Sequence, residues 1–222
     1  MVLAGAPRPA PKSRARTRRE RLGVGGLLAG VAALAVWLGG PVFWALVAAV
    51  ALLAWREWVR LAPALPARLG GLAYIAVPAL ALLWLRAEPN GLWLVLWLFA
   101  IVWAADVGAF LVGRALGGAR LWPAVSPGKT WAGFWGANAA ATLASLALAE
   151  RVALSPGRAA AAGLGLALLA QAGDLFESWL KRRAGVKDSG TLLAAHGGVL
   201  DRMDSLAPVA PAVAAGVALG WL

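Results

Sequence analysis

The sequence predicts an all-α, polytopic integral membrane protein with about seven transmembrane helices and a cytoplasmic N-terminus. Hydrophobic residues fill 61% of the 222 positions and charged residues only 14%, whereas soluble domains carry about 45–50% apolar and about 25% charged residues. Thirteen Trp accompany a single Tyr, and Trp collects at membrane interfaces. This composition excludes a disordered chain, a collagen-like fibre and an ordinary cytosolic enzyme.

The predicted helices follow from apolar runs that approach the length of a bilayer crossing. About 20 apolar residues are needed to span about 30 Å of hydrocarbon. Seven runs on this scale occur, at residues 22–39, 41–56, 69–86, 91–113, 130–149, 158–178 and 204–222. The second run is short and starts with a proline, so we expect it to tilt, re-enter or thin the bilayer. The first follows a basic segment without a convincing cleavage site, which favours an anchor over a signal peptide.

The distribution of basic residues predicts the topology. Cytoplasmic loops of membrane proteins carry an excess of Lys and Arg. If the N-terminus is cytoplasmic, 18 of the 21 Lys and Arg residues fall inside, and only Arg86, Arg151 and Arg158 fall outside. Residues 1–21 are basic and lack apolar periodicity, so they are predicted to form a disordered cytoplasmic tail. Residues 22–222 then form the membrane-embedded domain.

The acidic residues are concentrated in one part of the chain. Half of the ten carboxylates lie in a single stretch, at Asp174, Glu177, Asp188, Asp201 and Asp204. Asp174 sits near the end of an apolar run, and a carboxylate at such depth normally faces a polar cavity or a partner. Asp106 lies inside another run, where it either faces a cavity or pairs with Arg114 as a structural contact.

The spacing of these residues predicts a site for phosphates. On a helix, Asp174, Ser178 and Lys181 share one face, and Asp201 and Asp204 can point to one side. The chain has no Cys and one His, and carboxylates alone favour a hard cation such as Mg²⁺. Interleaved Lys and Arg suit a triphosphate, and paired glycines let backbone N–H groups approach phosphate oxygens. The pattern predicts phosphoryl or nucleotidyl transfer on a lipid.

A second cluster lies at residues 113–133 and contains the sequence SPGKT at the expected start of the fifth helix. Ser126 and Thr130 there are either ordinary helix caps or ligand contacts. Lys129 would add positive charge to the anion site of a helix N-terminus. The segment is not a Walker A loop, because Pro123 stands where that motif requires glycine.

At these residues the chain resembles the phosphatidate cytidylyltransferases, or CDP-diacylglycerol synthases. The family signature is matched at Ser178, Leu180, Lys181, Arg182, Lys187, Asp188, Gly190, Leu193, His196, Gly197, Gly198, Val199, Asp201, Arg202, Met203 and Asp204. The segments Gly173–Ser178, Ser126–Thr130 and Asp106–Phe110 are also similar to the family. Two positions depart from its pattern. Ala194 replaces Pro or Gly, and Ala132 stands where Glu is common. The resemblance covers about residues 70–222.

The resemblance implies that residues 22–222 form a catalytic domain that transfers CMP from CTP to phosphatidic acid. The products would be CDP-diacylglycerol, for phospholipid biosynthesis, and pyrophosphate. It further implies Mg²⁺ with a second cation, for which K⁺ is the candidate, and a homodimer among membrane lipids. No nucleic-acid partner is expected. The location would be a bacterial-type inner (plasma) membrane, with the active site on the cytoplasmic side.

The same resemblance implies roles for individual residues. The metal ligands would be Asp174, Asp201 and Asp204. The catalytic residues would be Lys181, Arg182, Lys187, Asp188, His196 and Arg202. The substrate-binding residues would be Ser126, Lys129, Thr130, Ser178, Gly197 and Gly198.

Two other functions compete with this one. A related CTP-dependent transferase could act on another lipid phosphate or a polyprenol, and the apolar residues that face the lipid do not separate these acceptors. An ion transporter could use Asp106 and Asp174 to line a pathway. The crowding of charge toward one face of the membrane favours an enzyme over a transporter.

Overall fold

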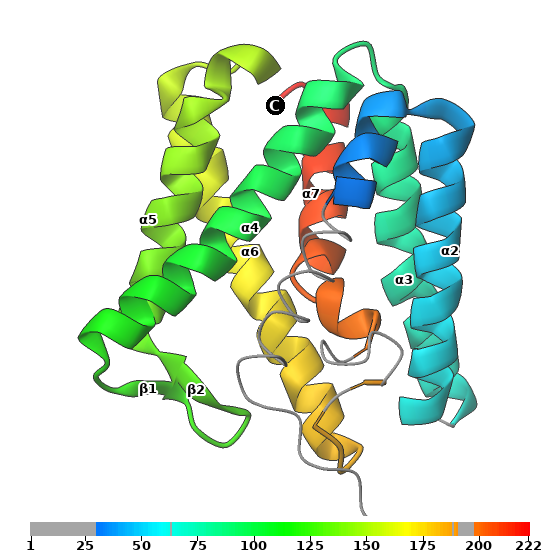
Figure 1. Cartoon of the computed structure of the whole chain (residues 1–222), viewed down its shortest axis with the longest axis vertical. Helices are drawn as coiled ribbons and strands as arrows, with labels where there is room; N and C mark the ends of the chain where they lie inside the picture. The colour runs from blue at the N-terminus through cyan, green and yellow to red at the C-terminus, as the bar shows by residue number, and fades with distance from the viewer. Residues whose placement is uncertain (1–29, 63, 188, 191–197) are drawn as a thin grey trace, which may run out of the picture.

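The computed structural model describes residues 30–62, 64–187, 189–190 and 198–222, and these residues are mostly helical (Figure 1). Residues 30–38 are helical and lead into the first labelled helix. The elements that follow are α2 (Gly40–Leu61), α3 (Leu65–Ala87), α4 (Gly91–Leu116), β1 (Arg120–Trp122), β2 (Ser126–Thr130), α5 (Trp131–Ala147), η1 (Ala149–Val152), α6 (Pro156–Arg183), η3 (Leu200–Arg202) and α7 (Leu206–Ala218).

Four helices, α2, α3, α4 and α6, are long and apolar enough to cross a membrane. This supports four of the seven expected spans. Helix α5 has 17 residues and α7 has 13, and the first expected span is described only from residue 30. The second run was expected to be short, but α2 extends over 22 residues. The apolar run ends at Arg56, whereas helix α2 continues to Leu61. The next residue, Glu57, is charged, but the helix can include it because its side chain is buried against the protein.

The all-α prediction is wrong in one place, because residues 120–130 form a β-hairpin between α4 and α5. Strands β1 and β2 are antiparallel, with Arg120 opposite Thr130 and Trp122 opposite Ser126. Proline restricts the preceding residue to extended conformations, and Pro127 therefore keeps Ser126 out of a helix. Thr130 then caps α5, since its Oγ1 accepts a hydrogen bond from the Gly133 amide at 3.0 Å.

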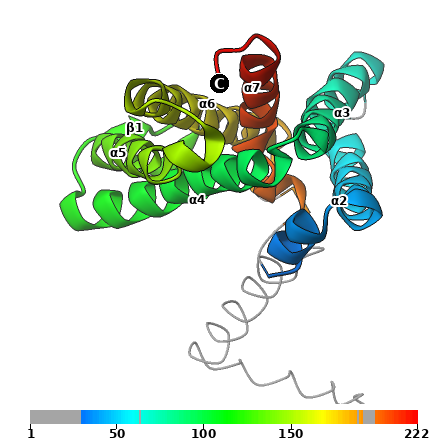
Figure 2. The same cartoon turned by 90° about the horizontal axis from the view of Figure 1, so that it is seen from above.

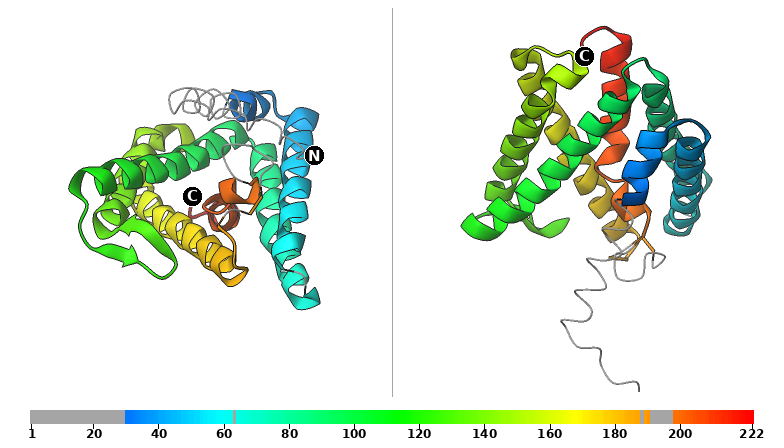
Figure 3. Two further views of the ribbon diagram at one scale, coloured as in Figure 1. Left: turned by 60° about the horizontal axis from the view of Figure 1, so that its bottom comes forward. Right: turned by 45° about the horizontal axis from the view of Figure 1, so that its top comes forward.

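The helices form two groups that are joined by α7 and by direct contact of α3 with α4. Helices α4, α5 and α6 pack together, α2 packs on α3, and α7 contacts both α3 and α6 (Figures 1 and 2). Seen from the end that carries the hairpin, the short η3 segment lies between α6 and α2 (Figure 3, left). This arrangement places η3, which contains Asp201, between the two groups.

Small residues set the distance between α4 and α5. A Cβ atom on Gly136 would lie 2.7 Å from the Gly108 carbonyl oxygen and 2.5 Å from Cβ of Val112. Small residues allow such close approach of helices in membranes. Deeper in the same group, the buried Trp97 indole N–H donates to Ser145 Oγ at 3.1 Å. Together these contacts hold α4, which carries Asp106, next to α5, which Thr130 caps.

We expect Gly136→Ala to lower the midpoint of thermal unfolding in detergent, because the new methyl group meets the α4 backbone. Gly165→Ala on α6 is the matched control, since nothing lies within 4 Å of its added Cβ. Ala is favoured over Gly in a helix by about 1 kcal/mol, so the control should be neutral or more stable. An unchanged midpoint for Gly136→Ala would show that the α4–α5 contact is looser than the structure indicates.

Candidate functional site

A cavity of about 430 Å³ lies where α4, the hairpin, α5 and α6 meet. Polar and charged side chains from α4, the hairpin and α6 line it, among them Asp106, Arg114, Lys129, Thr130, Gln171 and Asp174. Residues far apart in the sequence thus face one space, and three of them, Lys129, Thr130 and Asp174, are predicted site residues. A cavity with charges of both signs at the end of apolar helices is suited to a polar or charged ligand.

The central contact of this cavity is an ion pair between the hairpin and α6. Lys129 Nζ lies 2.5 Å from Asp174 Oδ2, and the two side chains are 24% and 32% exposed. Ser178 Oγ donates to Asp174 Oδ1 over a long distance of 3.5 Å. The structure therefore joins a predicted substrate-binding cation directly to a predicted metal ligand.

The structure does not support the alternative in which Asp106 pairs with Arg114. Among the residues that the structure describes, no ion pair joins Asp106 to Arg114. The Arg114 guanidinium instead lies 5.9 Å from the centre of the Phe110 ring. Asp106 faces the cavity and is close enough to Asp174 for their charges to interact.

A second polar cluster links α6 to η3 beside the cavity. Lys181 Nζ donates to Glu177 Oε1 at 3.0 Å and to Asp201 Oδ1 at 2.7 Å. The Lys181 and Asp201 side chains are only 13% and 10% exposed. Glu177 is wholly buried, and its Oε2 has no hydrogen-bond partner within the described part of the chain. One lysine therefore compensates two buried carboxylates.

Asp201 is held by backbone amides as well as by Lys181. The Gly198 amide donates to its Oδ2 at 2.7 Å, and the Ser189 amide lies 3.2 Å from both carboxylate oxygens. Burial acts to raise the pKa of Asp201, but its interactions with the neighbouring Glu177, Lys181 and Gly198 amide outweigh burial and lower the pKa to about 2. Asp201 is therefore an anion with a well-defined orientation.

The carboxylates fit a magnesium ion that is shared with a phosphate ligand. In the described ranges, no group of three or more His, Asp or Glu residues could hold a metal by itself. Mg²⁺ is usually bound by only one or two carboxylates, with waters and substrate phosphates completing its shell. Asp174 lines the cavity, and Asp204 lies near enough to interact with the charges of Asp174 and Asp106. Asp174 and Asp204 would therefore supply the one or two carboxylates that such a Mg²⁺ site needs.

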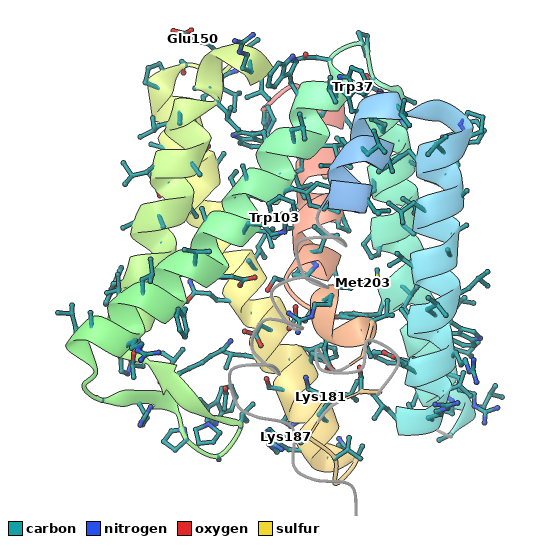
Figure 4. The ribbon with its side chains drawn as sticks, viewed as in Figure 1. Trp37, Trp103, Glu150, Lys181, Lys187 and Met203 are labelled. Carbon is teal, nitrogen blue, oxygen red and sulfur yellow. The ribbon has the colours of Figure 1, made fainter. Side chains whose placement is uncertain are left out.

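The other predicted residues are placed differently. Arg182 and Lys187 are exposed beyond the α6 cluster, and Figure 4 shows Lys181 and Lys187 near the same end of the molecule. Arg202 is exposed on η3, and Ser126 lies at the start of β2. The Gly198 amide donates to Asp201. Asp188, His196 and Gly197 lie outside the described residues.

The sequence interpretation missed a third buried carboxylate, Glu57 on α2. It is 3% exposed and accepts hydrogen bonds from Ser189 and from the amides of Val199 and Leu200. A local signal was present, since Glu57 follows Ala54 by three positions and precedes Leu61 by four, on the apolar face of α2. A carboxylate on such a face requires a partner.

Apolar helices around a charged cavity define an integral membrane protein with a site for a polar ligand. Residues 64–219 match the model of the family described as "Cytidylyltransferase family". The chain belongs to this family.

Relatives in three bacteria carry the name phosphatidate cytidylyltransferase. The protein from Brucella suis is 49% identical over 142 residues, which cover 63% of this chain and 53% of the relative. The Staphylococcus aureus protein is 42% identical over 63% of this chain and 54% of the relative. The Rickettsia bellii protein is 37% identical over 79% of this chain and 80% of the relative. In the Brucella and Staphylococcus comparisons, the match spans about half the length of the relative.

We expect Lys181→Met to destabilise the protein strongly, by about 3–5 kcal/mol, because it leaves the buried Glu177 and Asp201 without their cation. Lys129→Met is the matched control. It removes a lysine from a partly exposed ion pair, which contributes about 0–1 kcal/mol. Denaturant unfolding in detergent measures both variants. Equal stability losses would contradict the distinction between the buried and the exposed pair.

Proposed function

We propose that this protein transfers CMP from CTP to phosphatidic acid, forming CDP-diacylglycerol for phospholipid biosynthesis and releasing pyrophosphate. The observation that carries the proposal is the cavity in which Lys129 of the hairpin meets Asp174 of α6. This cavity lies within the segment that matches the cytidylyltransferase family. The names of the three relatives support the choice of phosphatidic acid as acceptor.

The reaction requires positioning and charge compensation more than proton transfer. An oxygen of the lipid phosphate forms a bond to the α-phosphorus of CTP, and the bond from that phosphorus to the leaving pyrophosphate breaks. The attacking phosphate is already an anion, so a strong general base is not needed. The protein must instead reduce the repulsion between two polyanions and stabilise charge on the leaving group.

The lysines have different tasks in this scheme. Lys129 lies on the cavity wall and can exchange its contact with Asp174 for a phosphate oxygen. Lys181 donates to Glu177 and Asp201, which favours a role in orienting Asp201. Arg182, Lys187 and Arg202 are assigned to the phosphates of CTP or lipid. The catalytic roles of Asp188 and His196, and the substrate contacts of Ser126, Thr130, Ser178, Gly197 and Gly198, are proposed from the family motif.

Asp174, Asp201 and Asp204 would hold Mg²⁺, which supplies neutralising charge at the phosphates when bound. Asp174 would contribute from the cavity wall. Asp201 already has a defined orientation through Lys181 and two amides, and Mg²⁺ would take the place of one of these donors at the carboxylate. A second cation, for which K⁺ is the candidate, is part of the proposal.

We place the site on the cytoplasmic side of a bacterial-type inner membrane, in a homodimer of seven-span chains with cytoplasmic N-termini. The positive-inside rule supports this orientation. Arg120 belongs to the hairpin and Lys187 lies toward the same end of the molecule, whereas Arg151 directly follows Glu150 at the opposite end (Figure 4).

We expect Asp174→Asn to reduce CMP transfer by about 100-fold or more, because the Mg²⁺ that would neutralise the reacting phosphates loses an anionic ligand. Purified protein in detergent would be supplied with labelled CTP, phosphatidic acid and Mg²⁺. Glu150→Gln is the matched control, since it removes an exposed carboxylate at the far end of the molecule (Figure 4). Wild-type turnover in a folded Asp174→Asn variant would remove Asp174 from the site.

Removing the metal provides an independent test of the reaction. Chelation of divalent cations should abolish product formation, and added Mg²⁺ should restore it. Failure to form product in wild-type protein that still binds CTP would indicate another lipid phosphate or a polyprenol as acceptor. Protein that binds no CTP, but carries ions across liposome membranes, would contradict the proposed activity and support transport.

A further inference from the structure

The carboxylate of Glu57 is buried in contact with the loop that leads to Asp201. Its Oε1 accepts a hydrogen bond from the Val199 amide at 3.0 Å. Its Oε2 accepts bonds from the Leu200 amide and from Ser189 Oγ, both at 2.9 Å. All three donors lie more than 130 residues away in the sequence. Both oxygens of this side chain are therefore used to hold two distant stretches of chain, at Ser189 and at Val199–Leu200.

Glu57 and Asp201 hold the same two stretches of chain. Ser189 donates its hydroxyl to Glu57 and its amide to Asp201. On the other side, the Gly198 amide donates to Asp201, while the next two amides donate to Glu57. A displacement of Glu57 would therefore move donors that fix the Asp201 carboxylate.

Close packing leaves this carboxylate little freedom. A Cβ atom on Gly190 would collide with Glu57 Oε1, and one on Gly198 would collide with Oε2. Apolar contacts surround the polar ones, because Trp58 of α2 belongs to the same buried cluster as Leu200. The two glycines thus allow the loop to approach the carboxylate directly.

We propose that Glu57 is a positioning residue that fixes the Asp201 carboxylate through Ser189 and the amides of Val199 and Leu200. This inference rests on the proposed function, in which Asp201 is a Mg²⁺ ligand. Side chains that hold metal ligands in place typically contribute about 10–100-fold to metal affinity or activity. Glu57 lies outside the segment 64–219 that matches the family, so the inference extends the functional site to α2.

The main test is Glu57→Gln in the full chain. A glutamine has one acceptor oxygen, and its NH₂ group would face an N–H donor, so one side of the contact is lost. The Mg²⁺ concentration for half-maximal CMP transfer should rise by about 10–100-fold. Glu150→Gln again serves as the control and should not change it. A purely structural role would lower the unfolding temperature without changing the Mg²⁺ dependence, and that result would overturn the proposal.

A double-mutant cycle tests whether Glu57 acts through Asp201. Residues that act through one another have non-additive effects. In an Asp201→Asn background, Glu57→Gln should therefore cause little further loss of kcat. Independent, multiplying losses would overturn the proposal. If Glu57→Gln does not fold, Ser189→Ala removes only one of the three hydrogen bonds and should shift the Mg²⁺ dependence in the same direction by a smaller factor.

Binding of Mg²⁺ alone provides a readout that does not depend on activity. Mg²⁺ should raise the unfolding temperature of the wild type, and Glu57→Gln should need about 10–100-fold more Mg²⁺ for the same effect. Equal Mg²⁺ titrations for both proteins would overturn the role of Glu57 and leave the proposed function intact. A wild type with neither Mg²⁺ stabilisation nor CMP transfer would overturn the proposed function itself, and this inference with it.

Discussion

The pairing of charged side chains on α6 is the constraint on which the rest of the structure depends. Asp174, Glu177 and Lys181 lie along the last turns of this helix, where an uncompensated buried charge is costly. The partners of these side chains come from different elements. The hairpin contributes Lys129 to Asp174, and η3 contributes Asp201 to Lys181, which also compensates Glu177. The hairpin and the η3 segment, which are not membrane spans, are therefore attached to α6 by charge.

The same constraint explains why the site combines cations and carboxylates. Lys181 is nearly enclosed between two acids, so it orients them and has little freedom to follow a ligand. Lys129 belongs to a more exposed pair at the cavity, where exchange of partners costs less. The difference in burial therefore divides the site into two parts. The part around Asp201 is fixed, whereas Lys129 at the cavity can change its partner when a phosphate binds.

Parts of this arrangement were predictable because they depend on local spacing. The helical spacing of Asp174 and Ser178 placed them together, as the structure shows. The depth of Asp106 predicted either a cavity-facing residue or a partner of Arg114, and it faces the cavity. The hairpin was missed because Ser126–Thr130 has the composition of a helix start. Glu57 has the spacing of the apolar face of α2, but it was missed because the predicted run ended at Arg56, and its partners, which lie more than 130 residues away, could not be predicted. Contacts over such distances leave no periodic pattern in the sequence.

Aromatic packing is what allows two separate helices to hold one loop. The Tyr74 ring of α3 lies 5.3 Å from the Trp58 ring of α2 and 5.5 Å from the Phe176 ring of α6. Trp58 and Phe176 directly follow and precede the two buried glutamates, Glu57 and Glu177, in the sequence. The row of rings therefore sets the spacing between the helices that carry these carboxylates. Hydrogen bonds lose strength when their geometry departs from about 2.9 Å and near-linear alignment, so the polar contacts around Asp201 require this apolar spacing to be maintained.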